Sequence, residues 1–269
     1  MLRKRVALPL TLAAGLLGSL ALVAPAEASH SWGDYHWARA GAFTLQTGDN
    51  VTDVWQAQFD AALTDWSTPP GGATPVLTLD AAAGLGGKRC SASTGTIQVC
   101  NGKYGRNGWL GLASIYITGG VHITKGTAKM NDTYFSTATY NTPDEKQHVM
   151  CQEVGHTFGL GHTSEDGTSQ NTCMDYSQSP TSTQPNAHDF QQLASIYNHG
   201  DTSTTVAASS GSSGQSVGNE RSTWGQEIER GAHGEFSVFM RDFGNGEKVL
   251  THVTWANESD SFGPSHRPE

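Results

Sequence analysis

The segment that most constrains this chain is Gln152–His162, which reads QEVGHTFGLGH. In a helix, Gln152 and His156 are one turn apart, so their side chains point from the same face. Gly159 favours the left-handed conformation that ends a helix and reverses the chain. The reversal brings His162 back towards the same point. The spacing therefore predicts a helix and a turn that direct three side chains, Gln152, His156 and His162, at one metal ion.

Glu153 follows the first of these predicted ligands and lies three residues before His156. At that position its carboxylate can stand beside a water at the metal without being a ligand itself. Three protein ligands leave a fourth position for the water, which is the arrangement of catalytic zinc. We therefore predict that Glu153 is a general base.

Capping residues predict where the helices of this region begin. Thr142 is a suitable N-cap, Pro143 fits the first helical position, and Glu145 can close a capping box. We expect this helix to run to about Phe158. A second N-cap, Asn186, precedes apolar residues at helical spacing and predicts a later helix.

Strand and helix patterns are mixed along the first 200 residues. Apolar side chains at helical spacing predict a long amphipathic helix over residues 51–66. Strand patterns cover residues 43–47, 75–79, 96–99, 109–118 and 122–130, with turns rich in Gly, Asn or Pro between them. The mixture predicts an α+β domain.

The composition changes after Gly200. Residues 201–218 are mostly Ser, Thr, Gly and Ala, which predicts a flexible linker. Residues 219–269 then hold two strand patterns around Phe243-Gly244-Asn245-Gly246, a strong hairpin signal. A lone hairpin is marginal in water, so we expect this small β tail to pack on something. We assign the catalytic domain to residues 29–200 and predict that the tail, set apart by the linker, is dispensable for the chemistry.

Residues 1–28 have the features of an export signal. Arg3-Lys4-Arg5 precedes an apolar run over residues 6–23, which ends at the small-x-small site Ala26-Glu27-Ala28. A membrane anchor is the alternative, and it is less favoured because no basic residues follow the run. We expect cleavage near Ser29 and a secreted, extracellular protein that has no membrane association afterwards.

The four cysteines form an even set, which export allows to oxidise. Pairing the two near neighbours joins Cys90 to Cys100 and leaves Cys151 with Cys173. The second bridge would connect the metal helix to the segment after His162. A zinc cluster of all four is the rival interpretation, but the sequence has no Cys-x-x-Cys pair.

The charge balance excludes one class of partner. The full chain has a formal net charge of −9, and the chain without residues 1–28 has 13 basic and 24 acidic residues, or −11. Nucleic-acid binding domains are usually basic, so we predict no nucleic-acid partner. We expect a monomer.

Residues 152–162 resemble the zinc-binding consensus of the metzincin metalloproteases, H-E-x-x-H-x-x-G-x-x-H, at every defined position except the first. Gln152 stands where the clan has His. Downstream, Cys173-Met174-Asp175-Tyr176 looks like the Met-turn of that clan, whose methionine lies beneath the metal. In the astacin and serralysin branches a tyrosine two residues later approaches the metal, so the likeness implies a catalytic role for Tyr176.

The resemblance extends over roughly residues 40–199. Trp109–Ala113 looks like the edge strand along which metzincins bind extended peptides, which implies substrate contacts at Leu110, Gly111, Leu112 and Ala113. It also implies a twisted mixed sheet with a backing helix, an active-site helix, a C-terminal helix and a metal cleft beneath the edge strand. The function implied is that of a zinc-dependent endopeptidase acting on an extended peptide or protein.

Gln152 leaves three interpretations open. Its amide oxygen ligates the metal, or His148, one turn earlier, replaces it, or the centre is degenerate and the chain is a weak or inactive binding module of metzincin fold. Gametolysin-like metzincins also carry Gln at this position. That likeness leaves copper open as the metal in place of zinc.

Overall fold

The computed structural model describes residues 30–206 and 216–257. The expected export signal at residues 1–28 lies outside the described residues, as do residues 207–215 of the expected linker and residues 258–269. Within the described residues, no helix is both long and apolar enough to cross a membrane.

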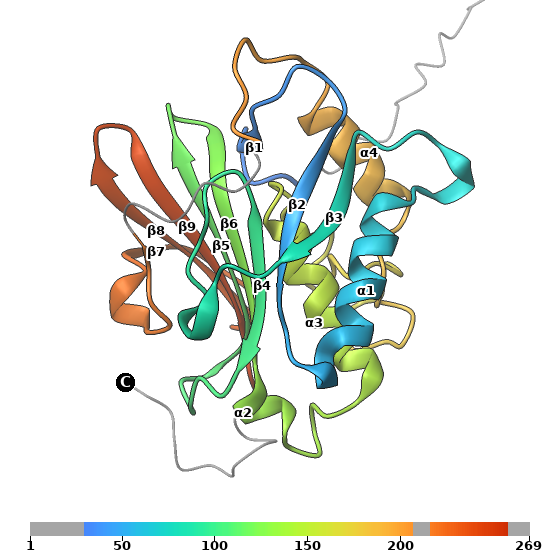
Figure 1. Cartoon of the computed structure of the whole chain (residues 1–269). Helices are drawn as coiled ribbons and strands as arrows, with labels where there is room; N and C mark the ends of the chain where they lie inside the picture. The colour runs from blue at the N-terminus through green and yellow to red at the C-terminus, as the bar shows by residue number, and fades with distance from the viewer. Residues whose placement is uncertain (1–29, 207–215, 258–269) are drawn as a thin grey trace, which may run out of the picture.

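A single mixed sheet organises the described chain (Figure 1). Its nine strands include the path β3-β2-β4-β6-β5-β9-β8-β7, and β1 pairs with β6 beside that path. Strands β1, β2, β3, β4 and β6 pair in parallel, whereas β5, β9, β8 and β7 pair antiparallel. The bounds are β1 His36–Trp37, β2 Phe43–Asn50, β3 Leu77–Ala83, β4 Ile97–Gly102, β5 Trp109–Thr118, β6 His122–Asn131, β7 Gln226–Arg230, β8 Phe236–Gly244 and β9 Glu247–Trp255.

Helices α1 and α3 pack against one another and against this sheet (Figure 1). The sheet and helices confirm the α+β prediction. The helices are α1 Asp53–Ser67, α2 Asp132–Phe135, α3 Pro143–His156 and α4 Ala187–Ile196, with short 3-10 turns at Pro70–Gly72, Gly87–Arg89 and Arg221–Thr223. In α1 the buried residues include Trp55, Phe59 and Trp66, whereas Val54 is 64% exposed.

Both predicted N-caps are present, and the full capping box is found at α4. The Thr142 side chain accepts a hydrogen bond from the Glu145 backbone N–H at the start of α3, and Asn186 forms a capping box with Asp189 at the start of α4. Helix α3 ends at His156, two residues before the expected end at Phe158. Gly159 has the left-handed φ of 96° that the sequence predicted.

The hairpin signal near residue 245 is also confirmed. Strands β8 and β9 pair antiparallel, and Asn245 and Gly246 at the turn both have positive φ, of 56° and 79°. The pairing partner of this hairpin is β5, with Ala113 opposite His252 and Leu112 opposite Val253. The hairpin therefore continues the sheet that the first 200 residues begin.

Strand β5 is not an edge strand in this structure, which corrects the expectation for Leu110, Gly111, Leu112 and Ala113. Their strand lies between β6 and β9, and its backbone pairs on both sides. The reason is that β9, itself an apolar strand, pairs with the side of β5 that a peptide was expected to occupy.

Alternate residues of the hairpin face two different cores. Leu250 belongs to the large core beneath α1 and α3. His252 and Thr254, on the same face of β9 as Leu250, contact residues of α3. Val249 and Val253 belong to a second core on the other face of the sheet, around Trp109, Leu112, Trp224 and Phe239. Burial on both faces stabilises the attachment of β9 to β5.

Both predicted disulfides are confirmed. Cys90 is bonded to Cys100, and Cys151 is bonded to Cys173, so all four cysteines are paired. The second bridge ties α3 to the segment that holds Met174 and Tyr176.

Candidate metal centre

The end of α3 and the loop after it bring two of the predicted ligands together. His156 is fully buried, and its Nε2 lies 3.1 Å from Nε2 of His162. The N-terminal segment supports this loop, because the Trp32 backbone N–H donates to the Gly159 carbonyl over 2.8 Å and the Trp32 ring stacks on the His156 ring. The structure therefore brings His156 and His162 together.

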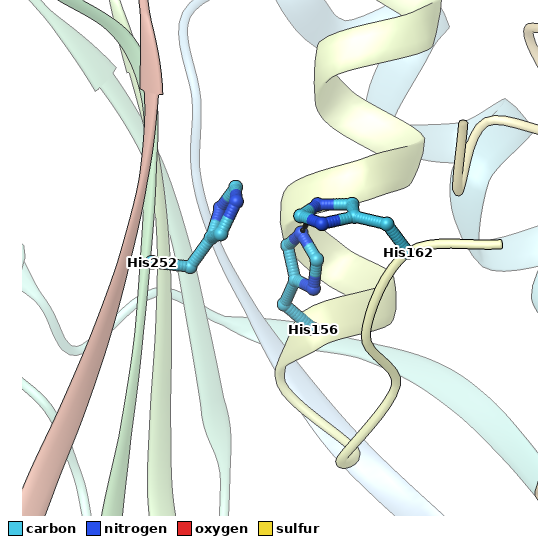
Figure 2. Close-up of side chains that lie close together, drawn as sticks. All are labelled: His156, His162 and His252. Atoms are coloured by element: carbon cyan, nitrogen blue, oxygen red, sulfur yellow. Dashed lines mark hydrogen bonds between the residues drawn. The ribbon is translucent and has the colours of Figure 1, made fainter. Parts of the chain in front are cut away.

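A third histidine, His252, completes the cluster from β9 (Figure 2). One ligand atom from each of His156, His162 and His252 lies within 4.8 Å of the others. Sequence reasoning missed His252 because the tail was expected to lie apart from the site. The available signal was its position in a strand pattern, between Leu250 and Thr254 on the face that becomes buried.

Hydrogen bonds at the far ring nitrogens orient two of these rings. His156 Nδ1 lies 2.8 Å from the Leu160 carbonyl, which only accepts, so Nδ1 donates and Nε2 keeps its lone pair. His252 Nδ1 lies 3.4 Å from Glu153 Oε2, a longer contact of the same kind. Partners of this type fix the ring orientation of metal-ligating histidines.

Burial keeps the three imidazoles neutral. Burial, together with the neighbouring His252, lowers the pKa of His156 to about 3. The pKa of His252 is also about 3 because of burial, and that of His162 is well below its ordinary value. Neutral imidazoles present lone pairs, which is the form that binds a metal.

Gln152 does not belong to the histidine cluster in this structure. Its Nε2 donates to the carbonyls of Cys173 and Asp175, over 3.1 and 3.0 Å. Its Oε1 lies 3.0 Å from the Thr254 hydroxyl, which donates to it. Every polar atom of this buried amide therefore has a protein partner.

His148 does not replace Gln152 in the cluster either. Its Nδ1 donates to the Ser182 carbonyl over 2.6 Å, and its Nε2 lies 3.5 Å from Gln152 Nε2. The ring is buried between α3 and the loop at Ser182, so its contacts are those of a core histidine.

Glu153 lies between the histidine cluster and β5. Burial raises the pKa of its carboxyl group to about 7, partly offset by His156 and by the hydrogen bond from Thr254. Thr254 Oγ1 is 2.6 Å from Glu153 Oε1. The absence of a side chain at Gly111 leaves room for this carboxyl group, because a Cβ at residue 111 would clash with Glu153 Oε1. A carboxyl group that titrates near pH 7 is suited to proton transfer.

The segment that holds Met174 and Tyr176 lies beside the histidine cluster. Met174 is fully buried, and its carbonyl accepts from the Thr163 backbone N–H over 2.8 Å, one residue after His162. The Tyr176 hydroxyl is 2.9 Å from Nε2 of both His162 and His252. Burial raises the pKa of Tyr176 well above its ordinary value, so the hydroxyl stays protonated. The hydroxyl oxygen of Tyr176 therefore lies next to two ring nitrogens of the cluster.

Access to this centre is restricted on the hairpin side. Glu153, His156 and His252 are fully buried, and only His162 among the cluster is partly exposed. An open cavity of about 440 Å³ reaches His162, lined by His162, Thr163, Ser164, Glu165, Asp166, Ala232 and His233. Small molecules and ions can approach by that route, but a polypeptide cannot reach Glu153 while β9 is paired with β5.

Comparison with known proteins found no match for this chain. The chain matches no protein-family model, and it has no match among curated proteins.

Proposed function

We propose that this chain is a secreted, metal-dependent endopeptidase with a metzincin-like centre, and that the structure describes its closed state. The single observation that supports the proposal is the convergence of His156, His162 and His252 beside the buried Glu153. Export, which the two disulfides favour, and a monomeric state belong to the same proposal.

The cluster fits a zinc ion. Tetrahedral zinc with bonds of about 2.0–2.1 Å holds its donor atoms about 3.3 Å apart. The observed separation between the Nε2 atoms of His156 and His162 is 3.1 Å, close to that value. His156 already donates through Nδ1 to a carbonyl, so its Nε2 lone pair faces the other rings. Copper, which also accepts imidazole ligands, remains the second candidate metal.

The proposed reaction is peptide-bond hydrolysis. Bound zinc supplies Lewis acidity, which acidifies water and polarises a carbonyl group. Glu153 accepts a proton from the attacking water and passes it to the leaving amine, a role that suits its pKa of about 7. The Tyr176 hydroxyl, held near His162, donates a hydrogen bond to the developing oxyanion.

A peptide substrate requires β9 to leave β5. The hairpin fills the position in which an extended peptide would add to β5. The Thr254 hydroxyl also forms a hydrogen bond with the Glu153 carboxyl group that a substrate would have to replace. We propose that the substrate is an extended peptide or protein segment that takes the place of β9. Release of β9 also removes His252 and leaves a ligand position open, with Gln152 freed from Thr254 to supply its amide oxygen.

The second candidate function is a catalytically inactive binding module of the same fold. The observation that favours it is the complete set of hydrogen bonds at Gln152 and Glu153, because a buried and satisfied network is costly to break. In that case the histidine cluster is a structural metal site that holds the hairpin in place.

The metal content and the peptidase activity of the purified chain separate these functions. We expect bound zinc, and hydrolysis of a fluorogenic peptide mixture that Glu153→Gln lowers by about 100-fold or more while the metal stays bound. Asp144→Asn, at an exposed position in the first turn of the same helix, is the matched control and should leave both unchanged. His156→Ala should lose metal and activity together. Bound metal without any hydrolysis that depends on Glu153 would support the binding module instead.

A further inference from the structure

A second group of histidines lies outside the centre described above, where three separate parts of the chain meet. His36 is in β1, His122 begins β6, and Asp201 follows α4. Strands β1 and β6 pair in parallel with His36 directly opposite His122, so their side chains leave the same side of the sheet. One ligand atom from each of His36, His122 and Asp201 lies within 4.8 Å of the others.

One oxygen of Asp201 is the centre of this group. Asp201 Oδ1 is 3.5 Å from His36 Nε2 and 3.3 Å from His122 Nε2. A fourth residue, His199, has its Nε2 at 3.8 Å from the same oxygen and at 3.2 Å from His36 Nε2. These separations are close to the spacing of about 3.3 Å between donors around tetrahedral zinc.

The second ligand atoms of Asp201 and His36 already have protein partners, which leaves their central atoms for a ligand. Asp201 Oδ2 accepts from the Arg39 backbone N–H over 3.0 Å and faces the Arg39 guanidinium at 3.4 Å. His36 Nδ1 lies 2.5 Å from the Asp34 carbonyl, so it donates and Nε2 of the neutral ring keeps a lone pair. A carbonyl on one ring nitrogen is the usual partner of a metal-ligating histidine.

One pair of central atoms, His36 Nε2 and Asp201 Oδ1, has no proton to share in the neutral tautomer of His36 and repels unless a cation lies nearby. The lone pair of His36 Nε2 can accept a proton from His199 Nε2, but it also faces the carboxylate oxygen of Asp201 at 3.5 Å. Either a metal ion or extra protons on the imidazoles must compensate. Because three imidazoles and one carboxylate match the ligand set and count of zinc, whereas calcium and magnesium prefer oxygen, a metal ion is the better match.

We propose that His36, His122, His199 and Asp201 bind a zinc ion in a structural site with four protein ligands. The side chains of His122 and His199 are 29% and 44% exposed, so the ion can enter from solvent. The site joins β1, β6 and the segment after α4, which are far apart in sequence. It shares no residue with the centre at His156 and does not depend on peptidase activity.

Such an ion would support the first centre indirectly. It anchors His36 and so the N-terminal segment, in which Trp32 stacks on the His156 ring at a centroid distance of 4.8 Å. Loss of the second ion should therefore loosen the packing around His156 without removing any of its hydrogen-bond partners.

The test counts zinc ions in the full chain after exchange into metal-free buffer and titration with zinc sulfate. Wild type should bind two equivalents, and His122→Ala and Asp201→Asn should each bind one. His156→Ala should also bind one, and His188→Ala, whose ring belongs to neither group, is the matched control with two. Replacement with Co²⁺ gives a second measurement, since tetrahedral nitrogen and oxygen ligands produce visible absorption that His122→Ala should reduce by about half.

The outcomes are distinguishable from those of the first centre. If wild type binds a single ion that His122→Ala removes, the second site stands and the first centre fails. If the zinc count is the same in wild type, His122→Ala and Asp201→Asn, the proposal is overturned, and the group is a set of imidazoles that contact Asp201 without a metal. Near-ultraviolet circular dichroism of each variant checks that the loss of an ion does not come from unfolding.

Discussion

The hydroxyl group of Thr254 connects the hairpin to α3, and its removal tests whether the hairpin is attached there in solution. Thr254→Val keeps the shape of the side chain and its preference for a strand. The change removes the hydroxyl whose single proton is shared between Gln152 Oε1 and Glu153 Oε1, at 3.0 and 2.6 Å. Thr254 is 7% exposed, so water cannot easily replace the hydroxyl.

The expected size follows from this burial. Leaving a buried acceptor without its donor costs about 1–3 kcal/mol. For a chain of this length each 1 kcal/mol corresponds to about 2–4 °C in Tm, so Thr254→Val should lower Tm by about 2–12 °C.

Thermal unfolding followed by circular dichroism at fixed zinc concentration measures the difference. Thr44→Val is the matched control, because Thr44 is an exposed strand residue whose hydroxyl pairs only with Thr78. It should change Tm by less than about 1 °C, as expected for surface substitutions. An equal Tm for the two variants would refute the reasoning, since it would mean that Thr254 does not contact α3 in solution.

Three further predictions concern packing, charge and the hairpin. Gly155→Ala should lower the free energy of unfolding, measured with urea, by about 1–3 kcal/mol. The new Cβ would lie 2.6 Å from the Trp66 ring and 2.7 Å from Met174 Sδ. Gly41→Ala is the control, because a Cβ there faces open space and should leave stability unchanged. Burial lowers the pKa of Lys129 from 10.5 to about 8, so the unfolded chain binds more protons between these values. Stability should therefore rise from about pH 8 to 10.5, and urea unfolding of Lys129→Met should show a flatter pH dependence; an identical slope in both proteins would exclude a buried, neutral Lys129. Ser114 Oγ and Thr251 Oγ1 are 3.1 Å apart on β5 and β9, so the double variant Ser114→Cys with Thr251→Cys should form a bridge that locks the hairpin. The oxidised form should keep its metal and lose peptidase activity by about 10-fold or more, with recovery on mild reduction; full activity in the locked form would show that β9 does not need to leave.

Local signals in the sequence were sufficient for most elements of the fold. Thr142 and Asn186 mark helix starts because capping is a short-range interaction, and Gly159 marks a chain reversal because φ near 96° suits glycine. Strand β5 was predicted with its observed bounds, since turn residues border it on both sides. Helix α3 ended two residues early, within the usual uncertainty of helix boundaries.

The partner of β5 was beyond such reasoning. Backbone pairing with β9 depends on a contact between residues 137 positions apart, as for Ser114 and Thr251, and no local pattern specifies it. The same limit hid His252. His156 and His162 were identifiable because a helix and a turn fix their relation, whereas His252 reaches them only through the order of strands in the sheet.

The order of strands also determines when the sheet can be completed during synthesis. Strand β5 leaves the ribosome long before β9 exists, because Ser114 and Thr251 are separated by 137 residues. Through that interval β5 has one unpaired backbone edge and two apolar faces, a combination that favours pairing with any available strand. Non-local pairing of this kind folds slowly, so the chain needs either assistance or rapid export in an unfolded form. The complete histidine cluster can form only after β9 has been made and has paired with β5, because His252 lies on β9.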